Sequence, residues 1–212
     1  MSEPVLSIGL IFKNEIRCLE RCLQSLEPLR QAVPCEVVMA DTGSEDGSRA
    51  VAEKYADIII DFPWVNDFSA ARNAVMDRAS GEWYLSIDAD EWLDGDISEL
   101  TDFLLGSRGK ACSAADIVVR SYTTHELAGY YIDGLLNRLV RMSTGIRYQG
   151  AIHEVWIPPK GQKEVKAELE HTILHHDGYV GLRDEEGRAK RERNRSILRA
   201  ELEKKPEDLR LL

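Results

Sequence analysis

Apolar residues in the first half of the chain form short continuous runs that alternate with helix-like periods. The run from Val5 to Phe12 ends at Lys13-Asn14-Glu15 and is typical of a strand buried on both faces. Further strands are predicted over 36–41, 57–61 and 83–88. Apolar positions three and four apart predict helices over 19–26, closed by Pro28, over 48–55, and over 68–79, capped by Asp67 or Ser69. Such alternation predicts right-handed crossovers and a mainly parallel sheet in residues 1–105.

The pattern changes after residue 105. Apolar stretches over 117–122, 135–141 and 172–176 have no convincing helices between them, which predicts extra strands mixed with loops over the sheet edge. Residues 183–205 are dense in charge of both signs and predict a long helix with a solvated face.

Composition narrows the class of protein. The chain has 212 residues, 43% hydrophobic and 30% charged, which suits one large globular domain of the α/β class. With 27 Lys and Arg against 37 Asp and Glu, the net charge of -10 disfavours nucleic acid as a partner. A nucleotide ligand stays possible, because a divalent metal can bridge acidic side chains to phosphate.

The compartment expected for this chain is the cytoplasm. No stretch has the ~18 apolar residues that a membrane span needs, and the N-terminus lacks the basic region of a signal peptide. Cys18, Cys22, Cys35 and Cys112 show no CxxC spacing, so we expect buried free thiols in a reducing environment.

Acidic residues gather where the predicted strands end. Asp41 ends the second strand, and Asp88 and Asp90 follow the fourth strand on the same side of the chain. A single aspartate at such a place often only caps a turn. Two carboxylates this close repel each other unless a cation neutralises them, and hard oxygen ligands favour Mg²⁺ or Mn²⁺. The pair therefore indicates a metal that holds a diphosphate.

The sequence resembles family 2 glycosyltransferases with the GT-A fold, specifically the cytosolic bacterial branch. The resemblance rests on segments in a fixed order along nearly the whole chain: Phe12–Glu15, Asp41–Gly47, Asn66–Asn73, Asp88–Glu91, Ile152–Glu154 and His176–Tyr179. It implies a GT-A domain over 1–182, with a nucleotide-sugar-binding half over 1–105 and an acceptor-side half over 106–182. A C-terminal helical segment over 183–212 would follow.

The resemblance also implies roles in donor binding. Asp41 would read the uracil imide of a UDP-sugar, and Glu15 with the backbone around Phe12 would line the nucleoside pocket. Arg72 would contact the nucleobase or the donor phosphate, for which a planar cation is suited. Asp88 would face the ribose and the donor sugar.

The metal would take Asp90 and, by the match to the family's late His-x-Gly-Tyr, His176 as protein ligands. The alternative for His176 is a buried, hydrogen-bonded histidine, since imidazole is only a moderate match for a hard cation. His175 would then point to the opposite face.

The reaction implied is a metal-dependent, inverting sugar transfer to a glycan, a lipid-linked or a peptide acceptor. It needs a base near the acceptor, for which Glu154 is preferred and His153 is second. Alternatively, Glu154 orders a loop by pairing with an arginine such as Arg138 or Arg141. Two other functions stay open: a nucleotidyltransferase, disfavoured because Lys13-Asn14-Glu15 is not a glycine-rich basic loop, and a non-catalytic sugar-nucleotide-binding module.

The last residues predict the start of another helix. Pro206 suits a first turn, and Glu207 and Asp208 favour a helix N-terminus. Leu209, Leu211 and Leu212 follow without a stop signal. We therefore expect a longer polypeptide, continuing into helical repeats as in relatives of this family; the alternative is a C-terminal tail docked on the core.

Overall fold

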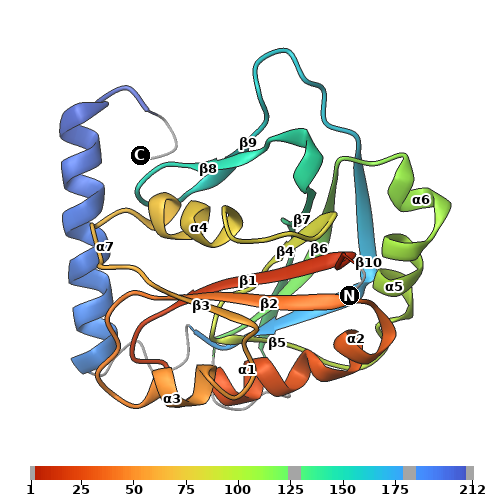
Figure 1. Ribbon diagram of the computed structural model, residues 1–212. Coiled ribbons are helices and arrows are strands. Elements are labelled where there is room, and N and C mark those ends of the chain that lie inside the picture. Colours follow the sequence, from red (N-terminus) through yellow and green to blue (C-terminus); the bar gives the residue numbers. More distant parts are fainter. Residues whose placement is uncertain (1–2, 124–129, 179–184, 209–212) are drawn as a thin grey trace.

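The computed structural model describes residues 3–123, 130–178 and 185–208, which form an eight-stranded sheet flanked by helices (Figure 1). The strands are β1 (Leu6–Phe12), β2 (Cys35–Asp41), β3 (Ile58–Asp61), β4 (Trp83–Ser86), β5 (Glu91–Leu93), β6 (Ala114–Tyr122), β7 (Tyr131–Arg141) and β10 (Lys166–His176). The helices are α1 (Leu19–Ser25), α2 (Glu27–Ala32), α3 (Ser48–Ala52), α4 (Phe68–Met76), α5 (Ser98–Leu105), α6 (Ser107–Lys110) and α7 (Glu185–Lys204). The short strands β8 (Arg147–Gln149) and β9 (Val155–Ile157) pair separately.

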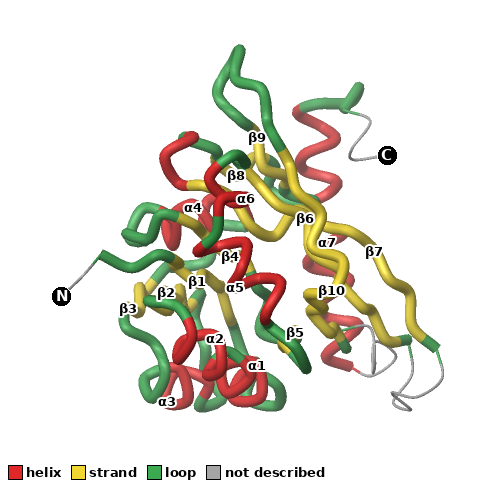
Figure 2. Tube along the Cα trace, turned by 90° about the vertical axis from the view of Figure 1, so that its right-hand side faces the viewer, coloured by secondary structure: helices red, strands yellow, loops and turns green. Residues whose placement is uncertain are grey.

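The strand order of the main sheet is β3-β2-β1-β4-β7-β6-β10-β5. The first four strands are mutually parallel, as expected for the first half of the chain. β7 runs antiparallel to both β4 and β6, while β10 is parallel to β6 and β5 is antiparallel to β10. Six of the eight strands therefore point the same way, and the second half extends the same sheet. Figure 2 shows β6 and β7 of this half side by side.

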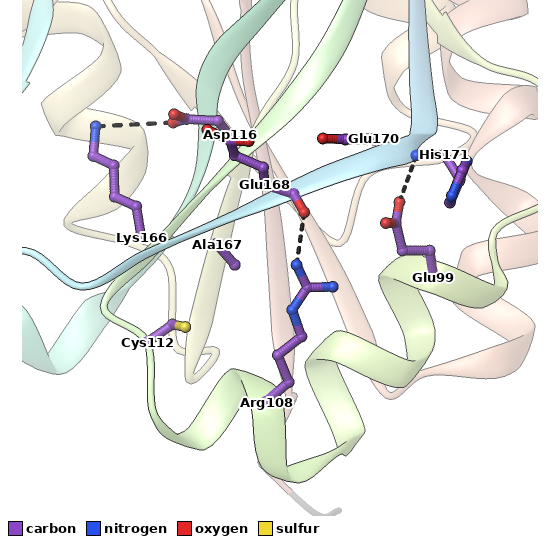
Figure 3. Close-up of a pocket in the computed structure, with 9 residues that line it drawn as sticks. All are labelled: Glu99, Arg108, Cys112, Asp116, Lys166, Ala167, Glu168, Glu170 and His171. Carbon is purple, nitrogen blue, oxygen red and sulfur yellow. Dashed lines mark hydrogen bonds and ion pairs between the residues drawn. The ribbon is translucent and has the colours of Figure 1, made fainter.

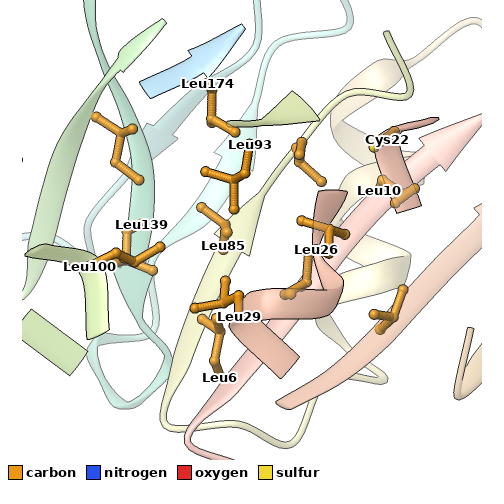
Figure 4. Close-up of a cluster of buried hydrophobic side chains, with 14 of the residues drawn as sticks. Leu6, Leu10, Cys22, Leu26, Leu29, Leu85, Leu93, Leu100, Leu139 and Leu174 are labelled. Atoms are coloured by element: carbon orange, nitrogen blue, oxygen red, sulfur yellow. The ribbon is translucent and has the colours of Figure 1, made fainter. Parts of the chain in front are cut away.

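The apolar runs are buried on both faces of the sheet. Leu6, Ile8 and Leu10 of β1 pack with α1, α2 and α5 in the larger cluster, part of which is drawn in Figure 4. On the other face, Val38 and Ala40 of β2 pack with α4 and the β8–β9 pair. This double burial explains why the strands read as continuous apolar runs.

Several boundaries differ from the sequence prediction. Pro28 was expected to close the first helix, but that helix ends at Ser25 and Pro28 lies in the first turn of α2, where its missing N–H costs nothing. The helix from Phe68 ends at Met76, and its cap is Asp67, whose side chain accepts a hydrogen bond from Ala70 N. Helices α5 and α6 were not predicted.

The charged segment near the end of the chain forms α7, as predicted, but one of its faces is not solvated. Ile197 is buried against Ile152, and Trp64 and Phe68 pack on the same cluster. The helix expected from Pro206 is not seen in its described part, since 206–207 form a turn, and 209–212 lie outside the described residues. Across the described ranges, every helix is too short or too polar to cross a lipid bilayer.

The four cysteines are free thiols. Cys18 and Cys22 are buried, whereas Cys35 and Cys112 are partly buried. Burial raises the pKa of Cys35 to about 12, so that thiol stays protonated and packs as a small apolar group.

Candidate active-site cleft

A cleft of about 1130 Å³ opens at the edge of the sheet where the parallel strands end. The segments that follow β1 and β4, together with the last residues of β6 and β10, form its floor. Residues 152–154 and the first half of α7 form its walls. Ligands of open α/β sheets bind outside the carboxyl ends of the strands, and the cleft lies at that edge.

The two aspartates after β4 face different partners within the cleft. Asp88 Oδ1 accepts a hydrogen bond from Arg72 Nη2 at 2.6 Å, and its Oδ2 lies 3.4 Å from Arg138 Nη2. Asp90 Oδ2 instead lies 3.7 Å from His176 Nε2 at the end of β10. The structure therefore brings together Asp90 and His176, the two residues that the sequence assigned to a metal.

The His176 ring is oriented from its other nitrogen. Nδ1 lies 3.2 Å from the hydroxyl of Ser121 on the neighbouring strand β6, which leaves Nε2 on the Asp90 side. His175 points to the opposite face, as expected from strand alternation, where its Nδ1 lies 2.7 Å from the Tyr122 hydroxyl. Sequence reasoning missed Ser121, because a partner on a neighbouring strand leaves no local signal.

Gly178 leaves open the space directly in front of Asp90 and His176. A Cβ at this position would collide with Asp90 Oδ2 and lie 2.5 Å from His176 Nε2. Among the described residues, no group of three or more His, Cys, Asp or Glu side chains could hold a metal ion. The pair fits a cation that takes its remaining ligands from phosphate and water, as Mg²⁺ commonly does. Tyr179, the last residue of the matching motif, lies outside the described residues.

A buried ion-pair network lies beneath the aspartates. Arg138 of β7 pairs with Glu91, which is 1% exposed and also accepts a hydrogen bond from Asp88 N at 2.8 Å. Burial raises the pKa of Glu91 to about 7, helped by the charge of Asp88 and opposed by Arg138. Burial alone would raise the pKa of Asp88 as well, but Arg72 and Arg138 outweigh it and hold that pKa well below its usual range. Asp88 is therefore ionised, and its charge is already balanced by arginine.

Arg72 lies buried at the centre of the site. Its Nε donates to Glu154 Oε1 at 2.7 Å, its Nη1 to Ser86 Oγ at 3.2 Å, and its Nη2 to Asp88. The expected contact of Arg72 with a nucleobase or phosphate stays a prediction. In the structure, Arg72 bonds to both Asp88 and Glu154 and so holds the two carboxylates next to each other.

The two candidate bases lie side by side on one wall of the cleft. Glu154 pairs with an arginine, as the alternative to a catalytic base expected, but the partner is Arg72 and not Arg138 or Arg141. His153 is exposed and has a φ of 53°, a left-handed conformation that is uncommon outside glycine. With the chain turning at His153, the side chains of both residues line the cleft.

The end of β1 and the segment after it line the cleft, and their expected role as the nucleoside pocket stays a prediction. Phe12 and Glu15 are both lining residues. Asn14 has a φ of 55°, and its Oδ1 accepts a hydrogen bond from Glu45 N at 2.8 Å. Glu15 N donates to Ser48 Oγ at 2.8 Å. These bonds fix the segment after β1 to the one after β2.

Asp41 lies at the end of β2 but outside the residues that line the cleft. Its Oδ1 accepts hydrogen bonds from Gly43 N at 3.0 Å and Ser44 N at 2.8 Å. The next residue, Thr42, does line the cleft. Asp41 thus shapes the turn beside the cleft, and its reading of a base stays a prediction.

A second, smaller hollow lies at the opposite ends of β6 and β10 (Figure 3). Glu99 of α5 reaches toward it, and its Oε2 accepts hydrogen bonds from His171 N and Thr172 N at 2.9 and 2.8 Å. These bonds hold the irregularity in β10 between Leu169 and Ile173. The hollow therefore lies beside the irregular part of β10, and none of its lining residues lines the cleft.

Comparison with known proteins adds a family match. The profile described as glycosyl transferase family 2 matches residues 7–152. A TPR repeat-containing protein of Synechococcus elongatus is 34% identical over 149 residues, which cover 70% of this chain and 34% of the relative. The prophage-derived glycosyltransferase SunS of Bacillus subtilis is 27% identical over 161 residues, covering 71% and 34%. The chain thus spans about a third of the length of these relatives.

Solved structures show the same fold. TarS of S. aureus, residues 1–349, superposes with a TM-score of 0.58 at 14% identity, covering 81% of this chain and 60% of TarS. A second structure of this TarS fragment, in complex with UDP, gives a TM-score of 0.53 at 15% identity over 77% and 60%. At these identities the likeness concerns the fold alone.

Proposed function

The chain belongs to glycosyl transferase family 2, and from this membership we propose that it transfers a sugar from a nucleoside diphosphate donor to an acceptor hydroxyl or other nucleophile. A UDP-sugar is the first candidate donor, because the TarS fragment of the same fold was solved with UDP. The acceptor class proposed is a glycan, a lipid-linked molecule or a peptide.

The observation that carries the proposal is the arrangement of Asp90, His176 and Gly178 at the floor of the cleft. A carboxylate oxygen and an imidazole nitrogen lie 3.7 Å apart, and a residue without a side chain keeps the space before them open. A diphosphate carries several oxygens that can complete the ligands of a divalent cation.

Asp90 and His176 would hold the Mn²⁺ or Mg²⁺, and such an ion would neutralise charge that develops on the departing diphosphate. Asp88 plays a different part in this proposal. Because Arg72 and Arg138 fix its carboxylate, Asp88 can accept hydrogen bonds from the ribose or sugar hydroxyls without needing the metal.

Glu154 is the proposed base of an inverting displacement. The acceptor nucleophile attacks the anomeric carbon, its proton passes to Glu154, and the bond between that carbon and the diphosphate oxygen breaks. The hydrogen bond from Arg72 to Oε1 orients the carboxylate. His153, the adjacent residue on the same wall, is the second candidate.

A thermal-shift screen tests the proposal. UDP, GDP and TDP, and a sugar conjugate of each, are added to the protein with Mn²⁺ and with EDTA. Ligand binding raises the melting temperature by mass action, so one nucleotide series should stabilise the fold, and more so with the metal. Absence of a metal-enhanced shift with every nucleotide would refute the proposed donor site.

The proposal includes the expected organisation of the longer protein. Residues 1–182 would form the catalytic domain, in two halves divided near residue 105, and the segment from 183 would lead into helical repeats. Support comes from the relative whose name includes TPR repeats and from the share of it that this chain covers. Sequencing the source reading frame through the codons after Leu212 tests this expectation.

A further inference from the structure

The inward face of α7 changes chemistry along its length. Positions three and four apart face the body of the protein, and in the second half of the helix they are mainly apolar: Ile197 is only 3% exposed and Leu198 and Leu202 pack beside it, with Glu201 as a buried charged residue. In the first half, the corresponding positions are Lys190, Arg193 and Asn194, which line the cleft instead. Figure 1 shows α7 standing at the side of the molecule away from the N-terminus. The apolar half thus docks the helix, and the polar half faces the proposed donor.

Lys190 connects α7 to the segment after β1. Its Nζ lies 2.8 Å from Glu15 Oε1, and both side chains are largely buried. Burial alone would lower the pKa of Lys190, but the hydrogen bond and charge of Glu15, with a contribution from Asp90, raise it. The ammonium group therefore stays charged, between the nucleoside side of the cleft and Asp90.

Arg193, which is half-buried, differs from the other arginines of the cleft floor. Arg72 and Arg138 are both committed to carboxylates. Arg193 Nε and Nη2 instead donate to the neutral amide oxygen of Asn194, at 3.1 and 3.0 Å. Within the described ranges, no carboxylate oxygen lies within 4.0 Å of its guanidinium group.

Packing keeps Arg193 at this place. The carbon of its guanidinium group lies 5.2 Å from the ring centroid of Phe68 and 5.9 Å from that of Trp64. Burial lowers the pKa of Arg193, an effect that the charge of Glu15 opposes. A partly desolvated cation without a carboxylate partner gains most from an anionic ligand.

We propose that Arg193 of α7 binds the diphosphate of the donor and of the departing nucleotide, beside the Lys190–Glu15 pair. The proposal rests on the proposed function, because it adds a cationic side chain, besides the divalent metal, to the binding of the same donor. Acidic side chains line much of the cleft, among them Glu15, Asp88, Asp90, Glu91 and Glu154. A diphosphate entering this cleft needs cations that are not already neutralised, and Arg193 is one. Its planar group can hold two phosphate oxygens at once.

Calorimetric titration with UDP and with uridine, in buffer with Mn²⁺, tests the assignment. Arg193→Gln is expected to lower UDP affinity at least tenfold and to leave uridine affinity and the melting temperature unchanged. Arg195→Gln is the matched control. It removes the same charge from the same helix, but Arg195 is 60% exposed and pairs with Glu192. Its UDP affinity should equal that of the wild type.

The outcomes separate this inference from the proposed function. If the wild type binds UDP and Arg193→Gln binds it equally well, the inference is overturned and the proposed function stands. An equal loss of UDP and uridine affinity would also overturn it, because the residue would then act on the nucleoside or on helix placement. If the wild type binds none of UDP, GDP and TDP, the proposed function fails and this assignment fails with it.

A measurement on the wild type covers the case in which the variant does not fold. Phenylglyoxal modifies accessible arginines, and peptide mass spectrometry reports the extent at each site. UDP should protect Arg193 at least fivefold, uridine should not, and Arg195 should react equally in all samples. Equal modification of Arg193 with and without saturating UDP would overturn the assignment.

Discussion

At the scale of single residues, buried arginines fix the carboxylates of the cleft. Arg72 and Arg138 balance Asp88, Glu91 and Glu154, whereas Asp90 faces His176. Carboxylates paired with arginine are rigid acceptors of hydrogen bonds, whereas the carboxylate of Asp90 is the one proposed to take up a cation together with His176. Neighbouring acidic residues thus differ in role because of the side chains behind them.

Gly178 tests whether Asp90 and His176 act as a cation site. Gly178→Ala should reduce the Mn²⁺-dependent gain in nucleotide affinity by about tenfold or more, because the added Cβ fills the space before both donor atoms. Gly134→Ala is the control, since a Cβ there meets nothing within 4 Å. Calorimetry with and without Mn²⁺ measures the effect. An unchanged metal-dependent gain in Gly178→Ala would show that the metal does not bind there.

Glu154→Gln tests the base. The glutamine can keep the hydrogen bond from Arg72 but cannot accept a proton, so turnover should fall by about 10²-fold or more while donor affinity changes little. Steady-state kinetics with the identified donor and acceptor provide the measurement. Wild-type turnover would transfer the role to His153, and a parallel loss of donor affinity would place Glu154 in donor binding.

At the scale of elements, the local sequence pattern predicts the strands of the first half, whereas contacts between distant segments determine which side chains meet in the cleft. Continuous apolar runs identified β1, β2, β3 and β4 within one or two residues, because such runs suit strands covered on both faces. The acidic ends of these strands predicted the cleft edge. The partners Ser121, Arg138 and Arg193 come from β6, β7 and α7, and no spacing in the sequence relates them to Asp90 or Asp88. Contacts between distant segments have no local signature.

Helix α7 also shows that a high density of charged residues does not by itself mean that a helix is solvent-exposed on all sides. Its sequence reads as a solvated helix, yet Lys190 and Arg193 face inward because Ile197 and its neighbours dock the helix. Ile197→Ala should undock α7, with faster amide hydrogen exchange in that helix and weaker nucleotide binding, while β1 and β4 keep their protection. Arg199→Ala on the exposed face serves as the control. Unchanged exchange in Ile197→Ala would mean that other contacts hold the helix.

At the scale of the whole molecule, the two halves share one sheet. The expected GT-A type α/β fold is confirmed, with a curled central sheet, flanking helices and a C-terminal helix. β7 joins β4 of the first half to β6 of the second. Because Arg138 lies on that strand, its pair with Glu91 also ties the second half to the segment after β4.

Arg138→Met should therefore destabilise the whole fold, by about 3–5 kcal/mol, since it leaves Glu91 buried without its partner. Burial raises the pKa of Glu91 to about 7, above its ordinary value of 4.5, so the folded chain holds this proton more tightly than the unfolded chain. The contribution of Glu91 to stability is thus greatest at low pH and falls as pH rises through that range. The penalty in Arg138→Met should shrink from about pH 8 to about pH 5.

Urea denaturation at both pH values measures this effect, and the double variant Glu91→Gln with Arg138→Met should recover part of the loss. A variant as stable as the wild type at both pH values would show that the pair does not stabilise the link between the halves.

The most direct test of the central claim is the affinity for the nucleoside diphosphate found in the screen, measured with Mn²⁺ and with EDTA for the wild type and Asp90→Asn. The wild type should bind at least tenfold more tightly with Mn²⁺. Asp90→Asn should lose that gain, yet keep its melting temperature without ligand, because the carboxylate is needed for the cation and not for the fold. Equal wild-type affinity in both buffers, or an undiminished gain in Asp90→Asn, would contradict a metal-held donor diphosphate at this site.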